Sequence, residues 1–273
     1  MSQSCNHDCS NCKENCAERD PKSFLVNPHP NSNIQSVVGV VSGKGGVGKS
    51  LVTSLLAVTT NKMGLGTAIM DADITGPSIP KVFGIKEKAT GNEHGIYPVR
   101  TLSGIDVMSM YLILEHDDDP VIWRGPVIAG TVNQFWSDVV YENADVLYID
   151  MPPGTGDVTL TVFQSIPLTG IVIVTSPQDL VSMIVSKAVN MAKMMNVPIL
   201  GIVENYSYYE CDECHKRVEI YGPSKVDEVA KKFGIETVVK LPLDPKLAKL
   251  CDEGKIELYD KLDLQPIVET LLD

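Results

Sequence analysis

A glycine-rich stretch near the start of the chain limits its fold more than any other feature. Residues 43–50 read Gly-Lys-Gly-Gly-Val-Gly-Lys-Ser, directly after the apolar run Val37–Val41 and directly before a helical stretch that begins at Lys49. Glycines let a backbone turn several N–H groups inward, and the N-terminus of a helix adds partial positive charge. This order of strand, loop and helix predicts a phosphate-binding loop on an α/β scaffold.

The residues of this loop are the first candidates for nucleotide contacts. They are Gly43, Lys44, Gly45, Gly46, Val47, Gly48, Lys49 and Ser50. Lys49 is expected to reach the β and γ phosphates of ATP, and the Ser50 hydroxyl is expected to bind Mg²⁺. Lys44 is a second cation that an ordinary loop of this kind does not need. It is therefore a candidate to cross a dimer interface and stabilise the charge that develops during phosphoryl transfer.

Short apolar runs alternate with helical stretches along the rest of the chain. The runs are Val37–Val41, Ala68–Met70, Val146–Ile149, Ile171–Thr175 and Ile199–Val203. Such unbroken runs are typical of strands buried on both faces. Helices are predicted over 49–63, 126–139, 179–195 and 223–233, with Asp179 as a cap and Gly64 and Gly234 as ends. We predict an α/β fold with a mostly parallel, doubly wound sheet and helices on both faces.

Carboxylates follow two of the predicted strands. Asp71 and Asp73 come after one strand, and Asp150 comes directly after another. Because ligands bind at the carboxyl edge of such sheets, Asp73 is a candidate to orient or deprotonate the attacking water and to contact Mg²⁺. Asp150 is a candidate for the same metal ion, whereas Asp71 is as well explained as a loop cap. Gly154, in a flexible segment, is a candidate to sense the γ phosphate through its backbone N–H.

The charge balance excludes two classes of partner. The chain has 23 Lys and Arg against 35 Asp and Glu, a net charge of −12, which disfavours nucleic acids and anionic membranes. No apolar run approaches the roughly 20 residues of a membrane helix, so we expect a cytoplasmic protein. The chain has seven Cys, an odd number, and reduced thiols with a metal or redox role fit it better than a disulfide scaffold.

Four of the cysteines crowd the N-terminus. Residues 1–33 are polar and include Cys5, Cys9, Cys12 and Cys16, so we expect a flexible Cys-rich extension before a P-loop ATPase domain at 34–273. Four thiols are enough for an iron-sulfur cluster or for zinc. A second cluster, a zinc site and an arm that delivers iron all remain open for this group.

Cys211 and Cys214 form a second thiol group in a polar stretch that follows a strand. Two thiolates at this spacing supply half of a tetrahedral ligand set, and a twofold axis would complete it. Two chains would then hold one cluster, most simply [4Fe–4S], at a homodimer interface. A dithiol redox motif, a zinc site within one chain that includes His215, and inert cysteines are the alternatives.

Taken together, these segments resemble the deviant Walker A ATPases, the group that includes nitrogenase iron protein, MinD and ParA. Within this group the chain is most similar to the Mrp/ApbC family of iron-sulfur cluster carriers. The resemblance rests on the loop at 43–50, Asp71–Pro80, Trp123–Pro126, Asp150–Asp157, Val203–Asn205 and the Cys211/Cys214 pair. No physical role follows for the segment Trp123–Pro126.

The resemblance implies an ATP-hydrolysing homodimer in which Lys44 acts in trans. It also implies that Asp73 is the switch I carboxylate, Asp150 the Walker B aspartate and Asn205 an adenine contact. Such a protein would receive a cluster from assembly donors and pass it to apo-proteins. The main rival is a spatial-organising ATPase of the MinD or ParA kind. The acidic C-terminal end, which contains Pro266, and the net charge speak against that rival.

Overall fold

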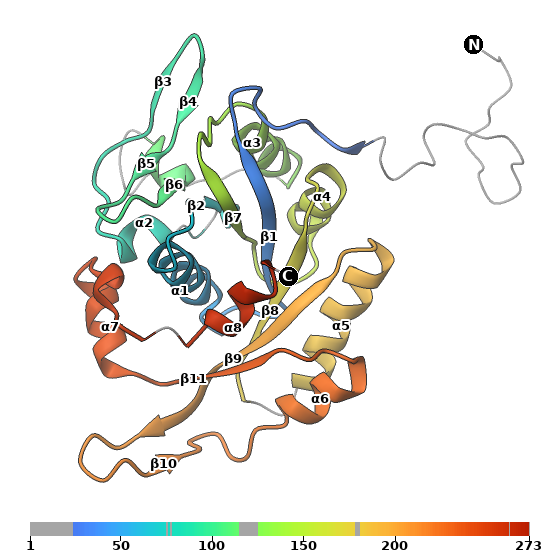
Figure 1. The fold of residues 1–273 in the computed structure, drawn as a ribbon. Coiled ribbons are helices and arrows are strands. Elements are labelled where there is room, and N and C mark those ends of the chain that lie inside the picture. The colour runs from blue at the N-terminus through green and yellow to red at the C-terminus, as the bar shows by residue number, and fades with distance from the viewer. Residues whose placement is uncertain are drawn as a thin grey trace, which may run out of the picture.

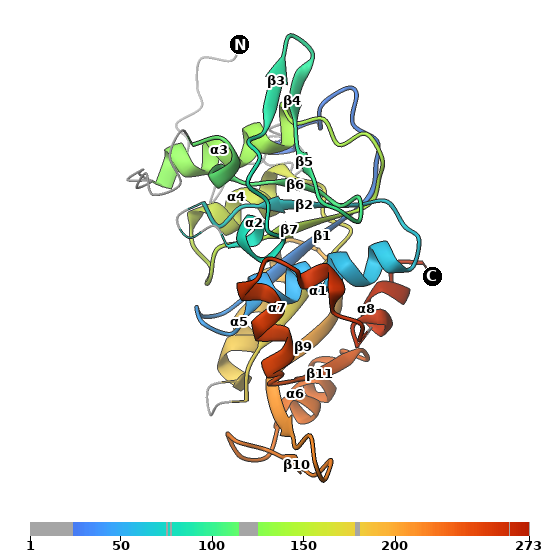
Figure 2. The same cartoon turned by 90° about the vertical axis from the view of Figure 1, so that its left-hand side faces the viewer.

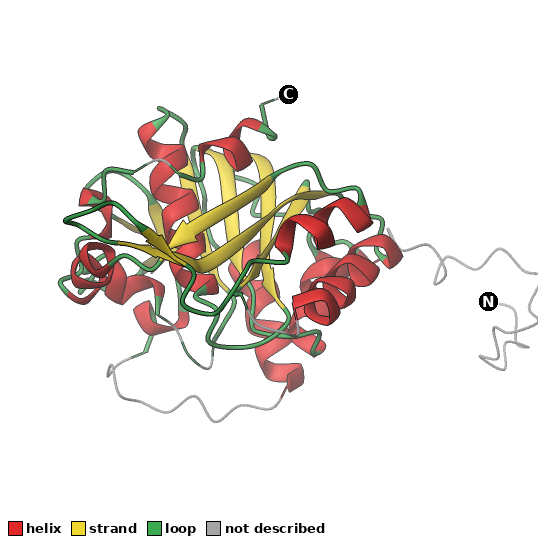
Figure 3. Ribbon diagram, turned by 90° about the horizontal axis from the view of Figure 1, so that it is seen from below, coloured by secondary structure: helices red, strands yellow, loops and turns green. Residues whose placement is uncertain are grey.

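A parallel sheet lies at the centre of the molecule, with helices on both of its faces (Figures 1 and 3). The structure is a computed structural model, and it describes residues 24–74, 76, 78–114, 125–177, 181–261 and 263–272. Several predicted residues lie outside this described part: Cys5, Cys9, Cys12, Cys16, Trp123, Arg124 and Asp179. What the sequence predicts for them stays a prediction.

Among the described residues, nine strands form the sheet in the order β10, β9, β8, β1, β7, β2, β6, β5, and β11 also pairs with β9. The strands are β1 Ile34–Ser42, β2 Thr67–Asp71, β5 Val99–Arg100, β6 Asp106–Met108, β7 Ala144–Asp150, β8 Gly170–Thr175, β9 Ile199–Glu210, β10 Arg217–Val218 and β11 Val238–Pro242. All pairs are parallel except β10 with β9 and β5 with β6. A separate hairpin of β3 Thr90–Asn92 and β4 Gly95–Tyr97 projects at the top of Figure 1.

The five strands that the apolar runs predict are confirmed, and they are neighbours in the sheet. They are β9, β8, β1, β7 and β2, in that order. β2 and β8 are buried along their whole length. A central strand of a parallel sheet is covered by helices on both faces, which is why these runs contain almost no polar residue.

The helices form two layers, each closing its own apolar core. One layer contains α1 Lys49–Lys62, α2 Ile79–Val82, α7 Pro245–Asp252 and α8 Gln265–Glu269; the other contains α3 Gly125–Ser137, α4 Asp157–Ser165, α5 Val181–Met194 and α6 Val226–Phe233. Two short 3₁₀ helices lie at Met110–Leu112 and Ile256–Leu258. Val37 and Val38 of β1 belong to different cores, as the alternation of side chains along a strand requires. Over the described ranges, every helix is too short or too polar to span a bilayer.

The predicted helices are confirmed, with one shifted start. Helix α6 begins at Val226 instead of Pro223, because Ser224 Oγ accepts a hydrogen bond from the Val226 N–H at 3.3 Å in the turn that precedes it. It ends at Phe233, and Gly234 follows with a left-handed φ of 71°, as predicted.

The last ten residues of the predicted N-terminal extension contact the domain. Val26 N–H donates to the Ser165 carbonyl at 2.8 Å, and its own carbonyl accepts from Trp136 Nε1 at 2.8 Å. Ser32 Oγ donates to the Val139 carbonyl. β1 begins at Ile34, one residue after the predicted boundary. The division of the chain at residue 33 stays a prediction.

We predict that the contact between Gly84 and Gly254 fixes the position of α7 against α2. A Cβ on Gly254 would lie 2.5 Å from Gly84 Cα, whereas a Cβ on Gly234 would meet nothing within 4 Å. The two glycines have nearly the same φ, 68° and 71°. Gly234→Ala should therefore cost about 1 kcal/mol for its left-handed backbone alone. Gly254→Ala should cost about 1–3 kcal/mol more, because it also overpacks the contact.

Urea denaturation of the two variants measures this difference directly. Equal losses of unfolding free energy for Gly254→Ala and Gly234→Ala would show that α7 and α2 separate freely and that the contact does not hold them.

Candidate functional site

The glycine loop leaves the carboxyl end of β1 and enters α1, as the sequence predicts. Gly46 and Gly48 have φ values of 80° and 79°, a conformation that favours glycine. Gly48 is constrained a second time, because a Cβ there would lie 2.2 Å from Asn205 Nδ2. That amide donates to the Val47 carbonyl at 3.0 Å. The conformation of the loop thus depends on its own glycines and on the hydrogen bond that Asn205 of β9 donates to it.

A buried ion pair lies at the start of α1. Lys49 Nζ is 2.7 Å from Asp150 Oδ1, and the two side chains are 6% and 1% exposed. Ser50 Oγ donates to Asp150 Oδ2 at 2.6 Å, and Thr53 Oγ1 donates to Asp150 Oδ1 at 2.7 Å. Lys49 therefore balances the charge of Asp150, and Ser50 and Thr53 each donate a hydrogen bond to one of its oxygens. All three residues lie near the start of α1.

The two carboxylates that follow β2 differ in environment. Asp73 is 18% exposed and lies 3.8 Å from Lys49 Nζ. Asp71 is buried, accepts from Ser109 Oγ at 3.0 Å, and accepts from the Asp73 N–H at 3.2 Å. Burial, together with the neighbouring charge of Asp150, raises the pKa of Asp71 well above its usual value. Asp71 thus positions the Asp73 loop, and Asp73 alone of the two faces the cavity described next.

An open cavity of about 420 Å³ lies over the loop, within the size range of small-molecule sites. Its walls come from the loop and α1, from the segment after β2, and from α7, which lies beside α1 and α2 in Figure 2. The lining residues are Ser42, Lys44, Gly45, Gly46, Gly48, Lys49, Ser50, Leu51, Asp73, Ser78, Val82, Pro153, Tyr206, Ala248, Cys251 and Asp252. The predicted loop contacts and Asp73 are therefore brought together around one space.

A set of oxygen donors that fits Mg²⁺ lies at this cavity. Ser50 and Asp73 line it, Asp150 is buried next to Ser50, and an oxygen of each lies 2.7–3.8 Å from Lys49 Nζ. Such hard oxygen donors are the ones that Mg²⁺ prefers. Backbone N–H groups of a glycine loop at a helix N-terminus fit the phosphates that this ion accompanies.

Two further predicted residues already have partners in this structure. The Gly154 N–H donates to the Ser42 carbonyl at 2.8 Å, so contact with a phosphate would require this hydrogen bond to break. Asn205 is buried, and its side-chain oxygen accepts from the Tyr206 N–H at 3.0 Å. Both residues lie next to the loop, but a direct role of either with nucleotide stays a prediction.

The second candidate site is the turn that joins β9 to β10, at the opposite end of the molecule from the β3–β4 hairpin (Figure 2). The Cys211 N–H donates to the Lys216 carbonyl at 3.1 Å, and the His215 N–H donates to the Cys211 carbonyl at 2.8 Å. His215 has a left-handed φ of 55°. This tight turn carries both thiols, with Cys211 half-buried and Cys214 exposed.

The turn is built to stabilise a thiolate. Backbone N–H groups of Cys214 and Glu213, and the Cys214 side chain, donate toward Cys211 Sγ and lower the pKa of Cys211. Within the described ranges, no three His, Cys, Asp or Glu side chains are placed to share a metal ion. The turn therefore offers two sulfur ligands, half of the set that a cluster or a zinc ion needs.

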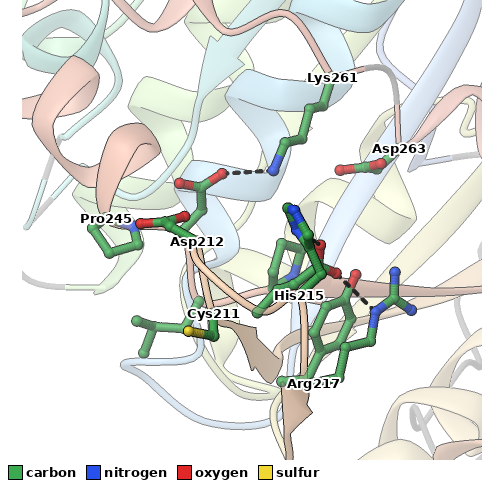
Figure 4. A pocket seen from close by; sticks show the side chains of 12 residues that line it. Cys211, Asp212, His215, Arg217, Pro245, Lys261 and Asp263 are labelled. Carbon is green, nitrogen blue, oxygen red and sulfur yellow. Dashed lines mark hydrogen bonds and ion pairs between the residues drawn. The ribbon is translucent and has the colours of Figure 1, made fainter.

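A charged pocket of about 330 Å³ adjoins the turn, with Cys211 in its wall (Figure 4). Arg217 Nε donates to Glu210 Oε2 at 2.9 Å, and Lys261 Nζ donates to Asp244 Oδ2 at 3.0 Å. Asp244 also caps α7, whose other end lines the nucleotide cavity. The pocket thus lies between the thiol turn and the first residues of α7.

Comparison with known proteins shows the family of the chain. A family model described as ParA, NUBPL iron-transfer P-loop NTPase, matches residues 33–271. The chain belongs to this family. The resemblance that the sequence motifs indicate is thereby confirmed.

Relatives in this family are similar over most of their length. The iron-sulfur cluster carrier protein of Clostridium perfringens (strain 13 / Type A) is 48% identical over 235 residues, which cover 83% of this chain and 82% of that protein. The protein of the same name from Methanocaldococcus jannaschii is 42% identical over 257 residues, 92% of this chain and 89% of its own. A solved structure of the nucleotide-binding protein from Archaeoglobus fulgidus, in complex with ADP, is 43% identical, with a TM-score of 0.78 over 85% of this chain and 91% of that one.

Sequence reasoning about this P-loop NTPase missed some residues of the nucleotide site. Thr53 lies one turn after Lys49, so the spacing of four residues on a helix was a usable signal. Ser109, Tyr206 and the α7 residues carry no such signal, because only the folded chain brings them to the loop. Cys251, which no sequence motif assigns to a site, is half-buried in the wall of the nucleotide cavity.

We predict that Cys211 is alkylated several-fold faster than Cys251 at a pH of about 7, although both thiols are half-buried. Its neighbouring N–H groups lower the pKa of Cys211, whereas burial raises the pKa of Cys251. Below both pKa values Cys211 has the larger thiolate fraction, so the ratio of rates should shrink as the pH rises above about 9. Mass spectrometry of the metal-free chain resolves the two peptides.

The same measurement in denaturant is the control, because both thiols then have ordinary pKa values and should react alike. A Cys251 that reacts at least as fast as Cys211 in the folded chain at neutral pH would contradict the assignment of a stabilised thiolate to the turn.

Proposed function

We propose that the protein is an ATP-dependent iron-sulfur cluster carrier. Two copies hold one [4Fe–4S] cluster between their Cys211 and Cys214 thiolates, hydrolyse ATP at their glycine loops, and pass the cluster to apo-proteins. The observation that carries this proposal is the occurrence of both half-built sites in one chain. A phosphate loop with a buried Lys49–Asp150 pair accompanies a two-thiol turn whose backbone stabilises a thiolate.

The nucleotide part of the proposal assigns roles to residues around the cavity. Lys49 neutralises the β and γ phosphates, and the loop N–H groups orient them for in-line attack. Asp73, the more exposed carboxylate, orients the attacking water and receives its proton. Mg²⁺, held by Ser50 with Asp73 and Asp150, supplies positive charge that stabilises the transferred phosphoryl group. Asn205 contacts the adenine, and Gly154 responds to the γ phosphate.

Lys44 completes the hydrolytic site from the partner chain. It lines the cavity beside Lys49, on the loop that borders open solvent. A cation delivered only when two protomers meet stabilises the transition state only in the assembled dimer. The rate of hydrolysis thereby depends on the geometry of the dimer. The same geometry determines how strongly the four thiolates bind the cluster.

The cargo part of the proposal follows from ligand number. Two thiols per chain match a cluster of four sulfur ligands only when two chains share it. The names of the relatives, iron-sulfur cluster carrier proteins, support the same cargo. A cluster at an exposed turn lies where donors can deliver it and acceptors can remove it. In this scheme Cys5, Cys9, Cys12 and Cys16 are candidates for a second group of iron ligands.

We predict that anaerobic reconstitution with iron and sulfide gives about four irons per dimer at the turn. The Cys211→Ala/Cys214→Ala variant should lose them. A full-length variant with serine at Cys5, Cys9, Cys12 and Cys16 is the control and should retain them. Iron analysis and the visible absorption of the cluster measure both. Retention of all iron by the Cys211→Ala/Cys214→Ala variant, with loss in the serine variant, would move the cluster to the N-terminus and contradict the proposal.

A mixing experiment tests the trans role of Lys44. Lys44→Ala and Lys49→Gln should each abolish ATP hydrolysis. Mixed together, they form heterodimers in which one site has Lys49 of its own chain and Lys44 of the other. Because half of the dimers would then have one competent site of two, about a quarter of the wild-type rate should return.

Lys44→Ala mixed with a chain that carries both substitutions is the matched control, since no site then receives both lysines. If the first mixture stays as inactive as this control, Lys44 acts within its own chain or not at all.

A further inference from the structure

One strand connects the two candidate sites. β9 leaves the sheet pairing with β8 at Glu204, the residue opposite Thr175. Asn205 and Tyr206 come next and contact the glycine loop, and the strand then continues to Glu210, directly before Cys211. Four residues therefore separate the loop contact at Tyr206 from the first thiol.

The pairing of β9 is irregular at the point where it meets the loop. Lys240 of β11 lies opposite Glu204, and Pro242 lies opposite Tyr208. Residues 205–207 of β9 thus stand against Leu241 alone, which makes a bulge. Tyr206, within this bulge, has a left-handed φ of 59° that a non-glycine residue adopts only under constraint. Bulges of this kind re-aim side chains and recur next to functional sites.

The bulge turns Asn205 and Tyr206 onto the loop. Asn205 Nδ2 donates to the Val47 carbonyl, and its Oδ1 accepts from the Tyr206 N–H. The Tyr206 hydroxyl lies 3.0 Å, and its ring carbon Cζ 3.4 Å, from where a Cβ of Gly48 would be. Tyr206 also lines the nucleotide cavity. The ring therefore touches the loop on one side and the nucleotide space on the other.

A buried hydrogen bond joins the two sides of the bulge, but some buried polar atoms beside it lack a partner. Ser207 Oγ donates to Glu204 Oε2 at 2.6 Å, and Glu204 is 0% exposed. Among the described residues, neither Glu204 Oε1 nor Thr175 Oγ1 has a hydrogen-bond partner. A buried carboxyl oxygen without a hydrogen bond is unfavourable, so the hydrogen bonds within the bulge satisfy its buried polar groups only in part.

We propose that the bulge at 205–207 couples the nucleotide cavity to the thiol turn, with Tyr206 as the positioning residue. Nucleotide in the cavity contacts the Tyr206 ring in the bulged arrangement and loses that contact when the ring leaves the loop. This difference in contact favours the bulge. Directly beyond the bulge, β9 pairs with β10, at Tyr209 with Val218 and at Glu210 with Arg217. An ordered bulge therefore holds this pairing in place, and with it the position of Cys211. The inference rests on the proposed function in taking Cys211 and Cys214 as the cargo ligands.

The test follows thiol alkylation in the full-length, metal-free, reduced chain, with and without a non-hydrolysable ATP analogue at saturation. In the wild-type chain, the analogue should slow alkylation of Cys211 and Cys214 by about threefold or more. Cys251 lines the cavity, so its protection reports occupancy of the nucleotide site in the same sample. Peptide mass spectrometry resolves all three thiols.

Three variants separate the bulge from other causes of protection. Tyr206→Asn keeps a residue that tolerates a left-handed φ but removes the ring, so Cys251 should stay protected while protection of Cys211 and Cys214 is lost. Tyr206→Phe keeps the ring on Gly48 and should retain the protection. Tyr221→Asn is the matched control, at an exposed tyrosine that lies after β10 and outside this pairing, and it should also retain the protection.

The outcomes distinguish this inference from the proposed function. Undiminished protection of Cys211 in Tyr206→Asn would overturn the coupling role of Tyr206 and would assign the shielding to dimer formation alone. An occupied cavity with unchanged Cys211 in the wild-type chain would overturn the coupling while leaving ATP hydrolysis and cluster loading intact. Failure of the analogue to protect Cys251 or to bind would remove the proposed function and this inference with it.

Discussion

The nucleotide site depends on one interaction, the buried ion pair between the Lys49 ammonium group and Asp150. The parallel sheet brings three carboxylates to one edge, and Asp71 and Asp150 are direct neighbours across β2 and β7. Lys49 pairs with Asp150 at 2.7 Å and lies 3.8 Å from Asp73. Burial and the charge of Asp150 both raise the pKa of Asp71, as expected where carboxyl groups crowd one edge of a sheet. Removing one member of such a buried pair typically costs about 3–5 kcal/mol, so the same contact that prepares the site for phosphate also holds α1 against the sheet.

The sequence was sufficient for the parts of the molecule in which one local pattern decides the structure. Unbroken apolar runs predicted the five central strands, because only a strand covered on both faces needs such a run. The glycine-rich sequence at 43–50 predicted a loop between a strand and a helix, and this loop joins β1 to α1. The edge elements β5, β6, β10 and β11, and the short helices α2, α7 and α8, escaped prediction because their stability comes from packing against that centre. In the same way, Asp150 was predicted from its position at the end of a strand. Tyr206 and Cys251 were not, since distant segments bring them to the cavity.

In the proposed function a second chain completes both candidate sites, for different physical reasons. The thiol turn offers two sulfur ligands where a cluster takes four, and Lys44 lines the nucleotide cavity, from which we propose that it reaches the partner chain. A twofold assembly would complete both sites together, which makes dimer geometry the common variable of hydrolysis and cluster binding. Strand β9 adds a link within each chain, because the residues that shape the loop precede the thiols on the same strand. A bulge with a strained Tyr206 is a suitable place for such a link, since bulges and strained backbone recur next to functional sites.

Native mass spectrometry of the reconstituted protein under anaerobic conditions tests the sharing of one cluster most directly. The account predicts a species with the mass of two chains, four irons and four sulfides. Dissociation of that species into single chains should release the cluster and leave neither chain with a complete one. Single chains that each carry an intact cluster, or dimers that carry one cluster per chain at Cys211 and Cys214, would contradict the account.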